Sequence, residues 1–420
     1  MLGSSSVFQA QNITHVKTLF DSLKTNPQTL AGDILIQKAL AGKKMVNGNL
    51  FPSIDLFSTY DYTTSPAGML PIAPNEMIHL VRDTIAAQPF SQNIIRSGAS
   101  ISIPIFIKSI YTTAQKAKML YQSAKQKAFI DLLKNEATLV SLNANLQYME
   151  QMILALKQKK KSIEKTQEII AIKVNNQRAP QSALLKINDA MNQINLAISD
   201  IALKKSEGVA MIQNLTGIHL TKAIEMTQTG SYTDSALVAL EPLKYKIEAE
   251  RLGVKAEREK LLPTLVARGN YNHSMAKAYN NGIDITKNYA TIGLVLKIPV
   301  FHQSQYAKIK MSRLELQSLE NDLSQKELEL STQADQLQEN LKILNNEISI
   351  FKQRIADKKS LQEIAKIAYK NERMTIEDYL KYEDDLVLEQ SKYYKTMAEK
   401  WQTLMKLAVI YGNNIETIVK

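Results

Sequence analysis

Four stretches of the sequence alternate between apolar residues and polar or small ones, which is the pattern of β-strands with two unlike faces. The clearest of them runs from Tyr289 to Ile298. Its alternate apolar residues, which we predict to face lipid, are Ala290, Ile292, Leu294, Leu296 and Ile298. The alternation predicts strands at about 53–63, 93–103, 264–274 and 288–298, arranged as two hairpins. Because isolated hairpins contain too little sheet to be stable, we expect other chains to complete the sheet.

In much of the remaining chain, apolar residues recur at alternating intervals of three and four positions. This spacing is typical of the seam of a coiled coil. The residues that carry it are Leu139, Leu142, Leu146, Met149, Ile153 and Leu156, and again Leu337, Leu341, Leu344, Ile348, Phe351 and Ile355. It predicts helices over 108–175 and 303–370, each about 100 Å long. Shorter helices are predicted over 12–50, 181–215, 236–261 and 376–411.

The two halves of the chain repeat the same order of elements. Residues 98–217 align with residues 293–412 without a gap, at an offset of 195 residues. We therefore predict an internally duplicated α+β chain. Its segments are a first repeat over 11–217, a connector over 218–235, a second repeat over 236–412 and a C-terminal tail over 413–420. The first hairpin is expected to close through a long proline-rich loop over about 63–92, and the second through a shorter loop over about 275–287.

The first ten residues resemble the tail of a secretory signal peptide, with Ala10 at the cleavage position. The basic residues that open such a signal are missing, since the first lysine is Lys17. Either the start is truncated, which we expect, or the resemblance is a coincidence. No run of about 18 apolar residues occurs, so no transmembrane helix is predicted. The chain has no cysteine, which excludes disulfides, thiolate metal sites and an acylated N-terminal cysteine.

The formal net charge of +11 indicates either an acidic partner, such as nucleic acid, or a lysine-rich solvated helical surface. The second interpretation is favoured, because the aromatic residues are not interleaved with the basic ones as they are in single-strand binders. We therefore expect no nucleic-acid partner.

No catalytic, cofactor-binding or metal-binding pattern is found in the sequence. The histidines include no pair spaced by four residues, and the glycines form neither a dinucleotide nor a phosphate-binding motif. Glu383-Asp384-Asp385 is acidic enough to bind a divalent ion, and Lys157–Lys161 is basic enough to bind phosphate. A solvated helix face explains both more simply. We expect a protein that is not an enzyme and uses no cofactor.

The order of elements resembles that of the TolC-like outer-membrane efflux proteins over about residues 12–415. The resemblance depends on the duplicated elements, on Phe51-Pro52 and Leu262-Pro263 before each hairpin, and on Ile-Pro after it. It implies an α+β membrane protein in which three chains assemble a twelve-stranded outer-membrane β-barrel, each giving four strands. Long coiled-coil helices would continue it as an α-barrel, with the connector in the equatorial region.

The resemblance also implies a function and partners. A homotrimer in the outer membrane of a Gram-negative bacterium would extend far into the periplasm. It would be the passive channel-tunnel of a tripartite efflux or type I secretion system, exporting small molecules or proteins. Its partners would be a periplasmic adaptor (membrane fusion) protein, an inner-membrane RND, ABC or MFS transporter, and outer-membrane lipid. The alternative is a periplasmic coiled-coil scaffold or the adaptor itself. An adaptor would need a single long hairpin of helices, flanked by β-rich domains.

The turn after the second long helix matches the pattern at the family's periplasmic entrance, a Tyr followed by Thr-Ile-x-Asp-x-Leu. The gate candidates are therefore Tyr369, Arg373, Asp378 and Lys381. Their spacing predicts that Tyr369 and Arg373 share one helix face and that Asp378 and Lys381 share another. The candidates for contact with the adaptor lie at the two helix turns and are Asn176, Arg178, Asn371 and Arg373.

Overall fold

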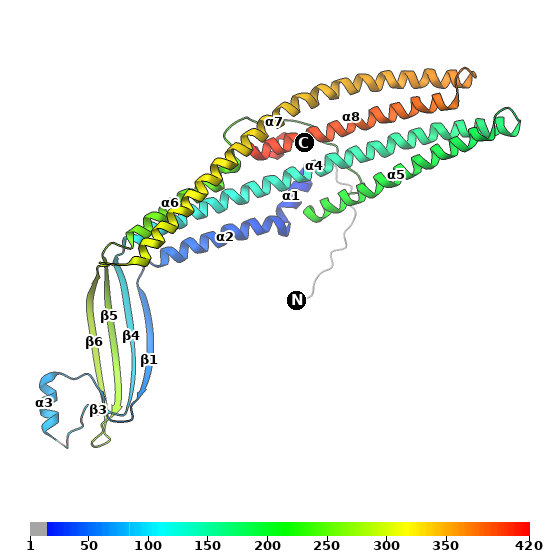
Figure 1. The fold of residues 1–420 in the computed structure, drawn as a ribbon. Coiled ribbons are helices and arrows are strands. Elements are labelled where there is room, and N and C mark those ends of the chain that lie inside the picture. Colours follow the sequence, from blue (N-terminus) through cyan, green and yellow to red (C-terminus); the bar gives the residue numbers. More distant parts are fainter. Residues whose placement is uncertain (1–14, 84) are drawn as a thin grey trace. The chain divides into compact units, whose positions relative to one another are not determined.

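A computed structural model describes residues 15–83 and 85–420 (Figure 1). The predicted signal-peptide remnant, residues 1–10, lies outside the described residues. The chain divides into two compact units. Of the described residues, the first unit comprises those up to Ile36 together with Ala124–Pro242 and Asp322–Lys420, and the second comprises those within Gln37–Ser123 and Leu243–Asn321.

The second unit contains a four-stranded antiparallel sheet in the order β1-β4-β5-β6. These strands are β1 (Ser53–Tyr62), β4 (Asn93–Phe106), β5 (Thr264–Lys277) and β6 (Asp284–Lys297). β5 and β6 extend further towards their connecting loop than the alternation predicts, because their pairing continues to Lys277 and Asp284. The register of β4 shifts between Pro104 and Phe106. Pro104 has no backbone N–H to donate to the neighbouring strand.

The segment between β1 and β4 is more ordered than the expected proline-rich loop. It contains two short paired strands, β2 (Gly68–Met69) and β3 (Phe90–Ser91), and the helix α3 (Pro74–Arg82). Pro74 opens α3, where its fixed φ and missing N–H cost nothing. Elements this short give no detectable periodicity in the sequence.

Long and short helices occur in both halves of the chain (Figure 1). They are α1 (Val16–Thr25), α2 (Pro27–Gly48), α4 (Lys108–Asn175), α5 (Gln181–Thr216), the 3-10 turn η1 (Val238–Leu240), α6 (Glu241–Glu259), α7 (Gln303–Lys370), α8 (Ile376–Tyr411) and α9 (Ile415–Ile418). α4 and α7 have 68 residues each, and α5 and α8 have 36 each. α5 and α8 both end at a glycine with positive φ, Gly217 and Gly412, which is a common helix stop.

The core of the first unit is formed by α1, α4, α5, α8 and α9 together with the connector. Phe20, Leu139, Trp401 and Ile415 are among its buried residues. The connector has little regular structure but is held on this core, because the side-chain amide of Asn143 both donates to and accepts from the backbone of Ile224, at 2.7 and 2.9 Å. These bonds give hydrogen-bond partners to the buried N–H and C=O groups of Ile224, which lies outside any helix or strand.

Candidate functional site

The turns after α4 and α7 have the same backbone geometry. Gln177 and Glu372, which are equivalent in the repeat, both adopt a left-handed conformation, with φ of 57° and 58°. The N–H of Arg178 donates to the carbonyl of Lys173, and that of Arg373 donates to the carbonyl of Ala368, at 2.7 and 2.9 Å. These bonds close a Schellman motif, in which glycine is usual at the left-handed position.

Below these turns, α4 and α5 pack through a buried seam. Its residues recur every seven positions: Leu156, Ile163 and Ile170 on α4, and Ile187 and Ile194 on α5. Tyr369, Ile376 and Leu380 of the second repeat pack against it. The seam is typical of a coiled coil and holds the turns in place.

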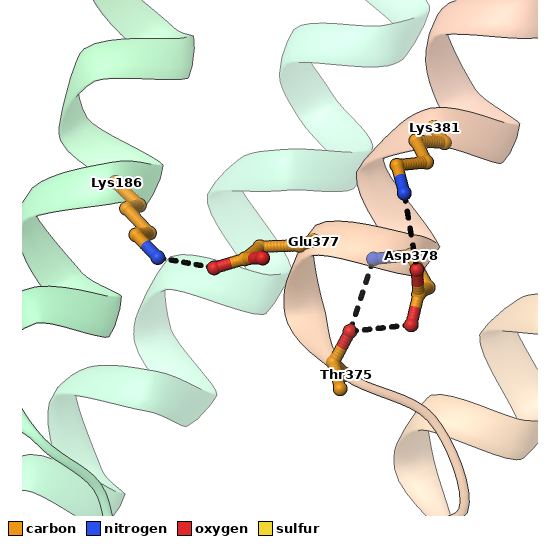
Figure 2. A network of polar contacts seen from close by, with 5 residues as sticks. All are labelled: Lys186, Thr375, Glu377, Asp378 and Lys381. Carbon is orange, nitrogen blue, oxygen red and sulfur yellow. Dashed lines mark hydrogen bonds and ion pairs between the residues drawn. The ribbon is translucent and has the colours of Figure 1, made fainter.

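Ion pairs join the two repeats near the turns, and in each the lysine belongs to the first repeat and the carboxylate to the second. Lys173 of α4 pairs with Glu372 at 2.8 Å. Lys186 of α5 pairs with Glu377 of α8, as Figure 2 shows, and Lys159 of α4 pairs with Asp384 of α8. At least one partner of each pair is well exposed, so each contributes about 0–1 kcal/mol.

The first two turns of α8 hold two of the gate candidates, Asp378 and Lys381. Thr375 caps the helix: its hydroxyl oxygen accepts from the N–H of Asp378 at 3.2 Å and donates to its carboxylate at 2.7 Å. Lys381 reaches the same carboxylate at 3.3 Å (Figure 2). The hydrogen bond from Thr375, and then Lys381, hold the pKa of Asp378 below its ordinary value. Asp378 is therefore a carboxylate at neutral pH.

The other two gate candidates do not share a helix face. Tyr369 lies in the last turn of α7, where its ring stacks on that of Tyr379 with centroids 5.4 Å apart. Burial raises the pKa of Tyr369. Arg373 lies in the turn beyond the end of α7, so the expected helical spacing from Tyr369 does not apply. Within the described residues Arg373 forms no ion pair, and Lys381 is the cation that binds Asp378.

A buried polar network near the turns was not identified from the sequence. The carboxylate of Glu383 accepts hydrogen bonds from Tyr379 at 2.5 Å, Ser162 at 2.7 Å and Gln362 at 2.7 Å. Tyr379 and Glu383 are only 1% and 3% exposed. Burial, and then the bond to Glu383, raise the pKa of Tyr379 well above its ordinary value. The network ties α4, α7 and α8 together, since these side chains come from all three.

The acidic triplet Glu383-Asp384-Asp385 is therefore not a solvated face as a whole. Glu383 is buried in the network, whereas Asp384 pairs with Lys159, and Asp385 pairs with Lys358 at 2.5 Å. Among the residues that the structure describes, no cluster of three or more histidines and carboxylates could hold a metal ion.

One more carboxylate is buried, in the core of the first unit. Glu136 of α4 is 4% exposed, and the core residues Leu133, Ala137 and Val140 lie within four residues of it in the sequence. Burial, and then the nearby charge of Glu416, raise its pKa to about 7. Removing a carboxylate from water favours its neutral form.

The sheet has two unlike faces, which the register separates, because directly paired residues point to the same side. One face is mainly apolar: Ile54, Leu56, Tyr60, Ala99, Ile101, Ile103, Ala267, Tyr271, Ala290, Ile292, Leu294 and Leu296. It carries one polar row, in which Ser58 bonds to Ser97 at 2.9 Å and His273 to Asn288 at 2.7 Å. Ile298, the last of the alternating residues, lies beyond the end of β6.

The opposite face is mainly polar: Asp55, Thr59, Asp61, Arg96, Ser100, Ser102, Arg268, Asn270, Asn272, Lys287, Thr291 and Lys297. Apart from Lys277 and Asp284, which face each other at the loop end, every Asp, Lys and Arg of the four strands lies on this face. Ile292, Leu294 and Leu296 on the apolar face are 93%, 68% and 62% exposed. A single chain therefore leaves a large apolar surface uncovered.

No helix in the described part of the chain has an apolar stretch long enough to cross a membrane. No protein-family model matches the sequence, and no curated protein matches it.

Solved structures do match the fold over nearly the whole chain. The CmeC outer-membrane channel of Campylobacter jejuni is 15% identical, with a TM-score of 0.80 over 98% of this chain and 91% of that one. The outer-membrane protein VceC of Vibrio cholerae is 12% identical, with a TM-score of 0.79 over 94% and 96%. The open-state MtrE outer-membrane channel of Neisseria gonorrhoeae is 12% identical, with a TM-score of 0.74 over 98% and 93%.

These proteins share the observed combination of long helices with a few antiparallel strands. This likeness gives the chain the fold of the TolC-like outer-membrane channel proteins.

Proposed function

We propose that three copies of this chain form an outer-membrane channel-tunnel. The observation that carries the proposal is the sheet, whose apolar face is exposed and whose outer strands, β1 and β6, each have one neighbouring strand among the described residues. An open edge is a template for further pairing, and closing the sheet into a barrel removes it. Three four-stranded sheets give twelve strands, with lipid on the apolar face and water on the polar one.

The fold supports a location for this assembly. The matching proteins are described as outer-membrane channels, and we place this chain in the outer membrane of a Gram-negative bacterium, with its helices in the periplasm. β5 and β6 have 14 residues each, and a tilted strand needs roughly 9–11 residues to span a membrane. Both strands are therefore long enough to span it.

The channel would be passive and would perform no covalent chemistry. A periplasmic adaptor and an energised inner-membrane transporter of the RND, ABC or MFS class would drive export of small molecules or proteins through it. We assign the contact with the adaptor to the turns that contain Asn176, Arg178, Asn371 and Arg373. Both turns have the same backbone conformation, so that six equivalent turns in a trimer would present repeated surfaces to the adaptor.

We assign the entrance gate to the end of α7 and the start of α8, with Tyr369, Asp378 and Lys381 as its residues and Arg373 in the turn between them. Threefold symmetry would turn Asp378 into a ring of three carboxylates. Lys381 offsets their repulsion, as the ion pair at 3.3 Å indicates. The pairs that join the repeats, such as Lys186 with Glu377, would keep the entrance hairpins together. They are weak enough for an adaptor to open them.

Membrane fractionation followed by planar-bilayer recording tests the proposal. The chain should remain in outer membranes after high-salt washing, and the purified protein should form ion-conducting trimers. Recovery in the soluble periplasmic fraction, without conductance, would instead support the coiled-coil scaffold.

A further inference from the structure

The segment between β1 and β4 is packed against the polar face of the sheet. Leu70 is fully buried in a hydrophobic cluster with Ile94 of β4 and Ala276 of β5, and Ile285 of β6 packs against this cluster. The register places all three of these partners on the polar face, because Ile94 pairs with Ala276 and Ala276 pairs with Ile285, whereas Ile95 on the opposite face is 42% exposed. The segment therefore covers one face of the sheet and leaves the other open.

The contact between this segment and the sheet is close. A Cβ atom at Gly68 would lie 2.8 Å from a side-chain carbon of Ile94 and 3.0 Å from the carbonyl oxygen of Ser91. Gly68 also pairs with Ser91 in the short β2–β3 ladder. A side chain at this position would have to displace the end of the Ile94 side chain and shift the Ser91 carbonyl, so the close packing favours glycine.

Polar contacts fix the rest of the segment to the same end of the sheet. Glu76 of α3 forms an ion pair at 3.1 Å with Lys287, which lies on the polar face of β6. Asn280 in the β5–β6 loop donates to the carbonyl of Ala86 at 2.8 Å and accepts from the N–H of Gln88 at 3.0 Å. As Figure 1 shows, α3 lies beside the loop end of β6.

We infer that α3 and its flanking residues form a constriction inside the outer mouth of the barrel. The inference rests on the proposed function, in which the polar face lines the water-filled lumen. A segment held on that face at the loop end lies within the lumen. Three copies around the axis would narrow the mouth with the exposed side chains of α3, which include Glu76, His79 and Arg82. This constriction would limit the size and charge of solutes that enter from outside.

The accessibility of the lumen to thiol reagents tests this inference, and the cysteine-free chain suits the method. Thr291→Cys places a thiol on the polar face deeper in the barrel, and Leu294→Cys places one on the lipid face as the matched control. In intact cells, a small hydrophilic maleimide should label the Thr291→Cys variant and not the control. A bulky polyethylene-glycol maleimide should label the Thr291→Cys variant only after residues 74–82 are replaced by a short glycine-serine linker.

A second set of variants keeps the test informative if the linker variant fails to fold. Glu76→Lys should release α3 and raise the labelling rate of the bulky reagent several-fold. Combining Glu76→Lys with Lys287→Glu should restore the slow rate by reversing the ion pair. Equal labelling by the bulky reagent with α3 intact or removed would overturn the constriction alone. Failure of the small reagent to label the Thr291→Cys variant would overturn the barrel, and with it the proposed function.

Discussion

The rings of Tyr369 and Tyr379 stack with their centroids 5.4 Å apart, and this contact joins the end of α7 to the beginning of α8. The Tyr379 hydroxyl lies in the buried network, where it donates a hydrogen bond to the Glu383 carboxylate. The hairpin at the proposed entrance is therefore held by a buried contact as well as by exposed ion pairs. The two kinds of contact should respond differently to mutation.

Removing the Tyr379 hydroxyl should destabilise the protein. Tyr379→Phe keeps the ring stack but leaves the buried Glu383 carboxylate without one donor, at a cost of about 1–3 kcal/mol. The melting temperature of the purified protein, measured by circular dichroism, should fall. The matched control is Tyr382→Phe, three residues further along α8, whose hydroxyl forms no hydrogen bond among the described residues. Equal melting temperatures for the two variants would show that the network contributes nothing.

The exposed ion pair between Lys186 and Glu377 should instead affect the channel more than the fold. Lys186→Glu places two carboxylates together and should raise single-channel conductance in planar bilayers, since repulsion separates α5 from α8. The double variant with Glu377→Lys should restore the original conductance. If the charge reversal leaves conductance unchanged in both variants, the pair has no part in closing the entrance.

The stability of the protein should depend on pH through Glu136. Its pKa is about 7 in the folded state against an ordinary value of 4.5, so the unfolded chain loses this proton first. Stability is therefore lost as the pH rises from about 4.5 to about 7, by on the order of 3 kcal/mol. Glu136→Gln stays neutral and should raise the melting temperature much more at about pH 8 than at about pH 5. Glu168→Gln, on an exposed part of α4, is the control, and an equal shift at both pH values would refute the role of Glu136.

The two faces of the sheet predict where a charge is tolerated. Leu294 lies on the apolar face and Thr291 on the polar one. An arginine at the lipid midplane costs about 2–4 kcal/mol, whereas an arginine facing water costs little. Leu294→Arg should therefore reduce the amount of trimer recovered from outer membranes more than Thr291→Arg does. Equal recovery of the two variants would reject the assignment of the faces.

The periodic parts of the fold could be predicted from the sequence because their physical basis is local. The seam spacing of residues such as Leu139 and Leu146 follows from helix geometry, and both residues are fully buried. The alternation in Tyr289–Ile298 likewise follows from the two sides of a strand. These patterns indicated long helices and a sheet with unlike faces.

The features that could not be predicted depend on contacts between distant segments. Glu383 stands in an acidic triplet that resembles a solvated face, and only Ser162, 221 residues away, and its other partners make its burial tolerable. The segment that contains α3 and the short strands is held in place partly by Leu70, which packs on the sheet. At the gate, helical spacing suggested that Tyr369 and Arg373 share a helix face. However, α7 ends at Lys370, so Arg373 lies in the turn.

Closure of the barrel by three chains is the central claim, and the repeat predicts which residues would meet between chains. Within one chain, Ser100 of β4 pairs with Asn270 of β5. Val295 of β6 is equivalent to Ser100 at the offset of 195 residues, and Thr59 of β1 is equivalent to Asn270 when Pro52 is aligned with Pro263. Both side chains lie on the polar face. If the pairing between chains follows the pairing within them, Val295 should therefore face Thr59 of the next copy.

The most direct measurement is disulfide cross-linking of Val295→Cys with Thr59→Cys in native membranes, followed by non-reducing electrophoresis. Exhaustive oxidation should give a covalent trimer as the end product. Leu294→Cys with Thr59→Cys, whose thiols lie on opposite faces, should remain monomeric. A covalent dimer or a ladder beyond three chains as the end product would contradict closure by three copies. Equal cross-linking in the mismatched control would contradict the predicted pairing.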